Sequence, residues 1–136
     1  PHHAARLEDI SINVDSIKPP ITKRSLVIEG CGGIFVPLST RIISYDIFCS
    51  WNCKWVVVSK HYLGSINHTL LTIDALKRKN VNIIGLIFNG EENPDSESVI
   101  LEQSQLPILG RLLPEQEINS QTIQRYVKQW QKNLFH

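Results

Sequence analysis

Apolar residues gather in four short runs separated by polar segments. The runs cover 26–28, 55–58, 83–88 and 108–109, and each is nearly continuous rather than alternating. Continuous apolar runs of this length are typical of parallel strands that are covered on both faces. We therefore predict four buried parallel strands.

A helical pattern lies between the second and third runs. Apolar side chains recur there at helical spacing, at Ile66, Leu70, Ile73 and Leu76. The basic segment 77–79 follows, and positive charge suits the C-terminal end of a helix. The two strands and this helix form a predicted βαβ unit.

Three further helices complete the pattern. One is predicted over 40–50, one over 95–105 after Asn93-Pro94, and the last begins at a capping Ser120. Alternating strands and helices imply a doubly wound, mostly parallel sheet in a three-layer α/β/α arrangement, here as a single α/β domain over 1–136. Ligands of such sheets bind outside the carboxyl ends of the strands.

Composition excludes several classes of function. The 136 residues carry 14 Lys+Arg against 13 Asp+Glu, a net charge of +1, which argues against nucleic acid as a partner. The longest fully apolar run, 55–58, is far too short to span a membrane, so we expect a soluble, cytoplasmic protein. Three cysteines are an odd number and predict no disulfide framework. Because methionine is absent, we expect that translation did not begin at Pro1.

The first strand leads into a glycine-rich loop, Glu29-Gly30-Cys31-Gly32-Gly33. Glycines allow positive φ and close approach of backbone N–H groups to a phosphate, and a carboxylate at a strand end can hold Mg²⁺. A plain tight turn with a solvated Glu29 explains the same residues.

The second strand ends at Lys60, and the following helix begins near Gly64, with Ser65 or Asn67 as its cap. The unpaired N–H groups of a first helical turn can bind a carboxylate. An ordinary helix start accounts for this segment equally well, and Lys60 can be simply solvated.

The third strand ends in Asn89-Gly90, where an amide that both donates and accepts could pair with adenine. The fourth strand leads into 112–115, whose apolar residues could flank a purine ring. Ordinary turns are the alternative at both places.

Taken together, four motifs resemble the dethiobiotin synthetase family. They cover 27–38, 63–72, 85–90 and 107–110, and the opening Pro1-His2-His3-Ala4-Ala5 is similar to a segment in the middle of that family's sequence. The resemblance extends over nearly the whole chain. It implies a P-loop NTPase-like fold that is incomplete at the N-terminus.

The resemblance also implies an activity. Members are ATP- and Mg²⁺-dependent ligases that form the ureido ring of dethiobiotin from 7,8-diaminononanoate and CO2 or bicarbonate in biotin biosynthesis. Glu29 would be the Mg²⁺ ligand, and the substrate carboxylate would bind across a homodimer interface. The nucleotide would contact Glu29, Gly30, Cys31, Gly32, Asn89, Gly90, Leu113, Pro114 and Glu115. The substrate would contact Gly64, Ser65, Ile66 and Asn67.

Two departures from the family pattern concern the nucleotide site. Cys31 stands where alanine is common, and Leu113-Pro114 replaces Ile-Pro, so the adenine loop could be displaced by one residue. The sequence also contains no Gly-x-x-x-x-Gly-Lys-Ser/Thr segment, so we expect the catalytic lysines upstream of Pro1 and an inactive isolated chain. The alternative is a non-catalytic, related nucleotide-binding or regulatory module.

Overall fold

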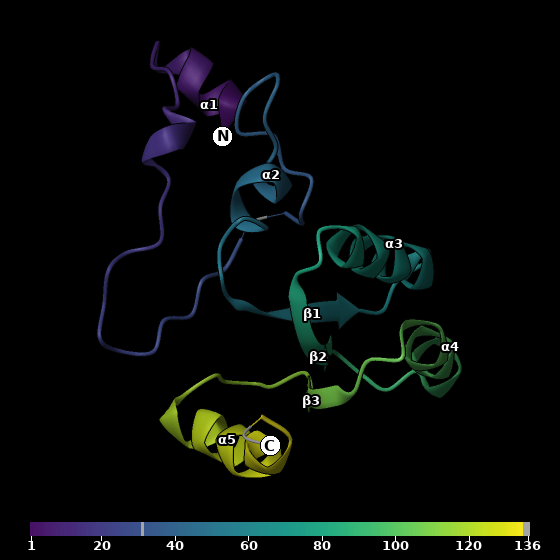
Figure 1. Cartoon of the computed structure of the whole chain (residues 1–136). Coiled ribbons are helices and arrows are strands. Elements are labelled where there is room, and N and C mark those ends of the chain that lie inside the picture. Colours follow the sequence, from purple (N-terminus) through teal and green to yellow (C-terminus); the bar gives the residue numbers. More distant parts are fainter. Residues whose placement is uncertain (31, 135–136) are drawn as a thin grey trace. The chain divides into compact units, whose positions relative to one another are not determined.

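The computed structural model describes residues 1–30 and 32–134, which form two compact units divided after Asn52 (Figure 1). The first unit contains α1 (His2–Leu7), the 3-10 turn η1 (Val14–Ser16) and α2 (Ser44–Phe48). The second contains β1 (Lys54–Lys60), α3 (Ser65–Arg78), β2 (Asn82–Asn89), α4 (Pro94–Ser104), β3 (Ile108–Leu112) and α5 (Ser120–Leu134). The expectation of a single domain over 1–136 stays a prediction.

The second unit is a three-stranded parallel sheet in the order β1-β2-β3. Parallel neighbours need a crossover, and α3 and α4 provide the two connections. Figure 1 shows α3 and α4 on one side of the strands and α5 on the other. The predicted open α/β sheet with helices on both faces is therefore confirmed.

Residue alternation along β3 explains how the two faces are covered. Arg111 contacts Glu97 of α4, whereas a side chain on Gly110 would lie 2.4 Å from the Trp130 ring of α5. Neighbouring residues of a strand point to opposite faces, so one face packs on α4 and the other on α5. Only glycine lets the Trp130 indole lie directly on the strand.

The core of this unit lies between the sheet and helices α3 and α4. Its fully buried members are Leu76, Leu86, Phe88 and Ile100. Ile73, from the predicted apolar face of α3, is also buried, at 2% exposure. A hydrogen bond also crosses this interface, between Ser59 Oγ of β1 and Thr69 Oγ1 of α3, at 2.8 Å.

Strand β1 is less covered than its apolar sequence predicts. Val57 and Ser59 are buried, but the alternate side chains Val56 and Val58 are exposed, Val58 by 62%. Ser59 bonds to Thr69 of α3, so α3 covers the face of β1 that carries Val57 and Ser59, and Val56 and Val58 lie on the opposite face. The expectation of burial on both faces is wrong for this strand.

The first unit departs from the predicted pattern at two places. The strand expected at 26–28 is irregular backbone, and Val27 is 93% exposed. A strand needs a neighbour to pair its N–H and C=O groups, and 26–28 finds none among the described residues. The helix expected over 40–50 is reduced to Ser44–Phe48.

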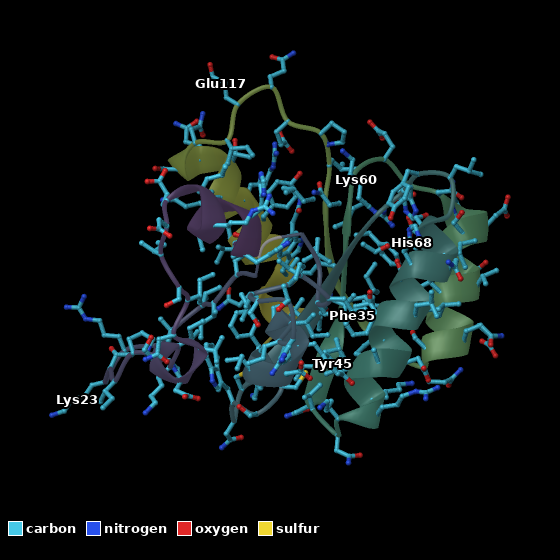
Figure 2. The ribbon with its side chains drawn as sticks, turned by 90° about the horizontal axis from the view of Figure 1, so that it is seen from above. Lys23, Phe35, Tyr45, Lys60, His68 and Glu117 are labelled. Carbon is cyan, nitrogen blue, oxygen red and sulfur yellow. The ribbon has the colours of Figure 1, made fainter. Side chains whose placement is uncertain are left out.

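Residues 34–45 of the first unit form a compact turn. Ser44 Oγ donates to the Ile34 carbonyl at 2.6 Å, and an antiparallel bridge joins Pro37 to Ile43. The Phe35 and Tyr45 rings meet edge to face, 5.2 Å between centroids (Figure 2).

Among the helices of the described residues, none is long and apolar enough to cross a membrane.

Two predicted caps are wrong. Helix α3 is capped by Gly64 at φ +96°, not by the side chain of Ser65 or Asn67. At α5, Asn119 Oδ1 accepts from the backbone N–H groups of Gln121 and Thr122, both at 3.1 Å, and Ser120 is already helical. An amide oxygen one residue earlier reaches both free N–H groups.

This geometry separates the two candidate caps of α5. Asn119→Ala is expected to lower the free energy of unfolding by about 1 kcal/mol, because two backbone donors lose their acceptor. The matched variant Ser120→Ala should change it by less than about 0.5 kcal/mol. Urea denaturation measures both, and equal losses in the two variants would show that Asn119 is not the cap.

Candidate functional site

The carboxyl ends of the three strands lie in one row. In the parallel register Lys60 of β1 pairs with Asn89 of β2, and Asn89 pairs with Leu112 of β3. The Gly90 N–H then donates to the Leu112 carbonyl at 2.8 Å. The loops that follow the strands, 61–64, 90–93 and 113–119, therefore start side by side, which is where the sequence predicts ligands.

Asn89 occupies the strand end as predicted. It is the last residue of β2 and its side chain is exposed, while Gly90 takes a positive φ of 122° as the chain turns. Neither Asn89 nor Gly90 is buried. The structure thus brings the Asn89-Gly90 pair next to the segment that contains Leu113.

The loop after β3 borders two hollows. Leu113 and Glu115 line a cavity of about 480 Å³ between β3 and α5, which Arg125, Tyr126 and Trp130 also line. Pro114 and Glu115 line a second hollow of about 470 Å³. Both hollows are open to solvent rather than enclosed.

Glu115 is held inside this loop by two donors. The Tyr126 hydroxyl donates to Glu115 Oε1, and Arg125 Nη2 lies 2.5 Å from the same oxygen. The Tyr126 hydrogen bond, followed by that of Arg125, lowers the pKa of Glu115. Tyr126 also accepts from the Leu113 N–H at 3.1 Å, so α5 holds this loop at Leu113 and at Glu115.

The anion site predicted from the sequence falls on the start of α3. Gly64 and Asn67 are exposed, Ile66 is half-buried and Ser65 is buried. The Ser65 N–H is bonded to the Tyr62 carbonyl at 2.9 Å. Because the N-cap is a glycine, no side chain caps the first turn of the helix by a hydrogen bond.

The glycine-rich loop lies in the other unit. Glu29 and Gly30 are exposed, and Gly32 and Gly33 take positive φ values of 72° and 100°, as the glycine pattern predicts. Cys31 lies outside the described residues. This loop belongs to the first unit, whereas the three strand ends belong to the second.

The donor chemistry of Glu29 fits magnesium. An exposed carboxylate is the hard oxygen ligand that Mg²⁺ takes from proteins, usually one or two per ion with water and phosphate in the remaining positions. The space beside Gly33 is open, because a Cβ there would meet nothing within 4 Å. No cluster of three or more His, Cys, Asp or Glu side chains that could hold a metal ion occurs in 1–30 and 32–134.

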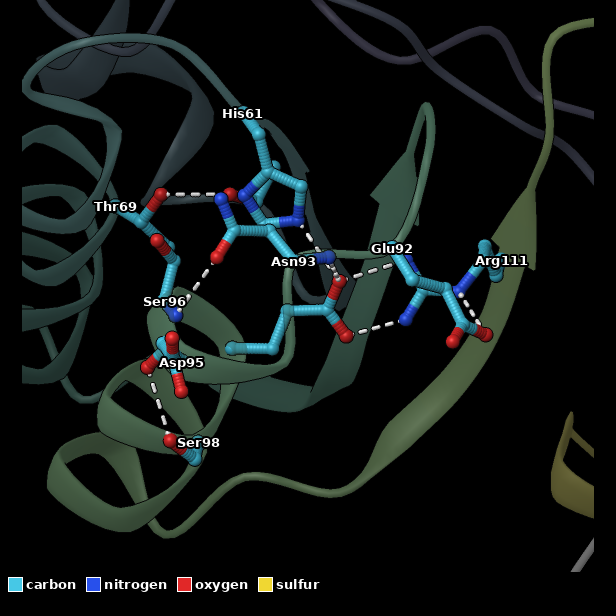
Figure 3. A network of polar contacts seen from close by, with 10 residues as sticks. His61, Thr69, Glu92, Asn93, Asp95, Ser96, Ser98 and Arg111 are labelled. Atoms are coloured by element: carbon cyan, nitrogen blue, oxygen red, sulfur yellow. Dashed lines mark hydrogen bonds and ion pairs between the residues drawn. The ribbon is translucent and has the colours of Figure 1, made fainter.

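Sequence reasoning missed the most strongly bonded group near the strand ends, the Glu97 carboxylate of α4 (Figure 3). It is 7% exposed and forms a two-pronged ion pair with Arg111, whose Nη1 lies 2.7 Å from Oε1 and whose Nη2 binds Oε2. His61 Nε2 lies 2.9 Å from Oε1, and the Asn93 N–H donates to it at 3.0 Å. The only sequence signal was a charged residue on the inner face of a short helix.

The charge state of Glu97 follows from these contacts. Burial raises its pKa, but the hydrogen bonds from Arg111, Asn93 and His61, with the Arg111 charge, outweigh burial and lower the pKa from 4.5 to about 2. The carboxylate is therefore ionised at neutral pH and accepts every bond. His61 Nε2 must carry the proton it donates.

The pKa of Glu97 predicts an acid-dependent stability. A carboxyl whose pKa is lowered on folding stabilises the protein above its unfolded pKa, here 4.5, and this contribution is lost as the pH falls to about 2. The shift corresponds to about 3 kcal/mol. Denaturation at pH 5.5, 4, 3 and 2 should show this loss in the wild type.

Glu97→Gln is the matched variant for this prediction. It is less stable at neutral pH because Arg111 stays buried without its counter-ion. Its free energy of unfolding should fall less steeply from pH 4.5 to 2. Identical slopes in the two proteins would contradict the assignment of the lowered pKa to Glu97.

Comparison with known proteins agrees with this geometry. The profile of a family described as AAA domain matches residues 1–122, and the chain belongs to this family. The match spans both units and ends within the first turn of α5. An open α/β sheet of the AAA-domain family is thus the class that fold and family define.

Particular relatives are ATP-dependent dethiobiotin synthetases. The chain is 41% identical over 132 residues to the one of Chlamydia pneumoniae, covering 97% of this chain and 60% of the relative. It is 40% identical over 131 residues to that of Chlamydia felis, with 96% and 62% covered. The Christiangramia forsetii protein is 39% identical over 134 residues, with 98% and 64% covered. The resemblance indicated by the motifs is confirmed, and the chain spans about 60% of the length of these relatives.

Proposed function

We propose that this chain is part of an ATP- and Mg²⁺-dependent ligase that forms the ureido ring of dethiobiotin from 7,8-diaminononanoate and CO2. The observation that carries the proposal is the row of strand ends, Lys60, Asn89 and Leu112, which begins the loops that resemble the family's nucleotide and substrate motifs. The extent of the likeness, 41% identity over 132 residues to a dethiobiotin synthetase, supports it.

The proposed reaction needs mainly positioning. One amine of the substrate takes up CO2 as a carbamate, ATP phosphorylates the carbamate, and the second amine displaces phosphate to close the ring, which leaves ADP and phosphate. No covalent bond to the protein forms. Phosphoryl transfer of this kind depends on orientation and charge neutralisation, and bound Mg²⁺ supplies neutralisation at the phosphates.

Two groups of residues in the second unit would bind the nucleotide base. Asn89 has an amide that can accept from the adenine amino group and donate to a ring nitrogen. The backbone of Gly90 and the segment Leu113 to Glu115 would flank the ring, beside the cavity of about 480 Å³. The exposed Asn89 side chain supports this arrangement. So does the pairing of Asn89 with Leu112, the residue before Leu113.

The loop from Glu29 to Gly32 would serve the phosphates and the metal, with Glu29 as ligand and the Gly30, Cys31 and Gly32 backbone as donors. At the other site, the first turn of α3 from Gly64 to Asn67 would bind the substrate carboxylate. We propose that this turn faces a second copy in a cytoplasmic homodimer. The fully exposed Leu63 beside it, at 101%, supports a contact there.

The intact gene product tests the proposal directly. Incubated with ATP, Mg²⁺, bicarbonate and 7,8-diaminononanoate, it is expected to release ADP and form dethiobiotin in a 1:1 ratio, measured by mass spectrometry. Omission of any one component should abolish both products. Tight binding of ATP with no turnover, when binding of diaminononanoate is verified, would instead favour a nucleotide-binding or regulatory module.

Asn89 and Asn82 form a matched pair for the adenine assignment. Both are exposed asparagines of β2, one at each end of the strand. Asn89→Ala should raise KM for ATP about 10- to 100-fold, the effect of one or two hydrogen bonds, with KM for diaminononanoate unchanged. Asn82→Ala should leave both constants within twofold. Equal KM values for ATP in the two variants would remove Asn89 from the nucleotide site.

A further inference from the structure

Glu97 connects the loops at all three strand ends. His61 immediately follows β1, the Asn93 N–H belongs to the segment after β2, and Arg111 lies near the end of β3, yet all three donate to this one carboxylate (Figure 3). Glu92 adds a contact from the second loop, 3.4 Å from Arg111 Nε. The relative placement of the loops therefore depends on a single buried acceptor.

His61 is the anchor of the first of these loops. Its ring stacks on the buried Phe88, with centroids 5.5 Å apart and planes 19° apart, and its side chain is only 14% exposed. The two residues that follow point outward, since Tyr62 is 57% and Leu63 101% exposed. His61 is thus the residue by which the 61–64 loop packs on the core.

The backbone of the 61–64 loop is least restricted at its last residue, Gly64. Gly64, at φ +96°, begins α3, and glycine has the largest conformational freedom of any residue. Two further bonds reach this loop, from the Ser65 N–H to the Tyr62 carbonyl at 2.9 Å and between the Tyr62 hydroxyl and His68 Nδ1 at 2.7 Å, the latter exposed to solvent. Within the 61–64 loop, His61 supplies the side-chain bond to a buried group of the core, three residues before α3 begins.

His61 itself carries a cost that points to this role. Its Nδ1 is buried and has no hydrogen-bond partner in the described part of the chain. A buried unsatisfied nitrogen is unfavourable, whereas an apolar ring would fill the same space without that penalty. The bond from Nε2 to Glu97 is what a phenylalanine could not supply.

We propose that His61 is a positioning residue for the substrate site: its bond to Glu97 and its stacking on Phe88 fix the 61–64 loop, and so the first turn of α3 that takes the substrate carboxylate. This inference rests on the proposed function. It assigns to His61 the affinity for diaminononanoate, and no part in the affinity for ATP.

Two substitutions separate the parts of the His61 contact. His61→Phe keeps an aromatic ring against Phe88 and removes the donor, whereas His61→Gln restores an amide donor at a similar reach. In the intact gene product, His61→Phe should raise KM for diaminononanoate about tenfold, with kcat and KM for ATP within twofold. His61→Gln should recover most of that loss.

Hydrogen exchange gives a readout that does not need activity. Backbone amides in 61–69 should exchange faster in His61→Phe than in the wild type and return toward wild-type rates in His61→Gln, while those of 83–88 stay unchanged. A merely structural role would accelerate exchange in both segments. It would also lower kcat and raise both KM values. That result would overturn the proposal.

Tyr62→Phe tests the competing tie. It removes the exposed bond to His68 and should change KM for diaminononanoate by less than twofold; a larger rise than that of His61→Phe would overturn the assignment to His61. If the wild-type protein forms no dethiobiotin, the proposed function fails, and the exchange rates of 61–69 still decide whether His61 fixes the loop.

Discussion

The ionised, buried carboxylate of Glu97 is the constraint on which the carboxyl edge of the sheet depends. A buried charge is tolerated only when its hydrogen-bonding capacity is filled, and here Arg111, His61 and the Asn93 N–H fill it. Those donors come from three different segments. Satisfying one side chain therefore fixes the loops after β1 and β2 relative to strand β3, which is a stricter condition than apolar packing imposes, because hydrogen bonds have direction as well as distance.

The surroundings of Glu97 show how the core and the loops share residues. Phe88 is fully buried, and the His61 ring and the Arg111 guanidinium both lie 5.5 Å from its centroid. The next residue, Asn89, is exposed at the strand end. A single step along β2 thus passes from the rigid core to a side chain that is free to meet a ligand. On the far side of β3, Tyr126 acts similarly by contacting both Leu113 and Glu115. The loops after β1 and β3 each contact a buried aromatic residue, Phe88 through His61 and Tyr126 through Leu113 and Glu115.

Sequence periodicity predicted the second unit well because its elements are defined by local patterns and by each other. The strands 55–58, 83–88 and 108–109 lie within β1, β2 and β3, and α4, at Pro94–Ser104, lies one residue before the predicted 95–105. The segment 26–28 failed because an apolar run does not say whether a partner strand is present. The caps of α3 and α5 failed by one residue, since Gly64 and Asn119 precede the residues that composition favoured. The positions of Asn89 and the Gly64 turn were predictable from strand ends. The Glu97 contacts were not, because they join residues up to 36 positions apart.

The contact between Trp130 and Gly110 limits which substitutions the protein can accept at these two positions. An added methyl group on Gly110 would lie 2.4 Å from the indole, so no larger residue fits while tryptophan stands at 130. Conversely, a small residue at 130 would leave a void over the strand and loosen the helix that carries Tyr126. Substitutions at the two positions are thus permitted mainly as a pair, and an evolving sequence must cross a less stable intermediate to exchange them. The contact between a residue with no side chain and the largest side chain of all is for this reason among the least replaceable in the chain.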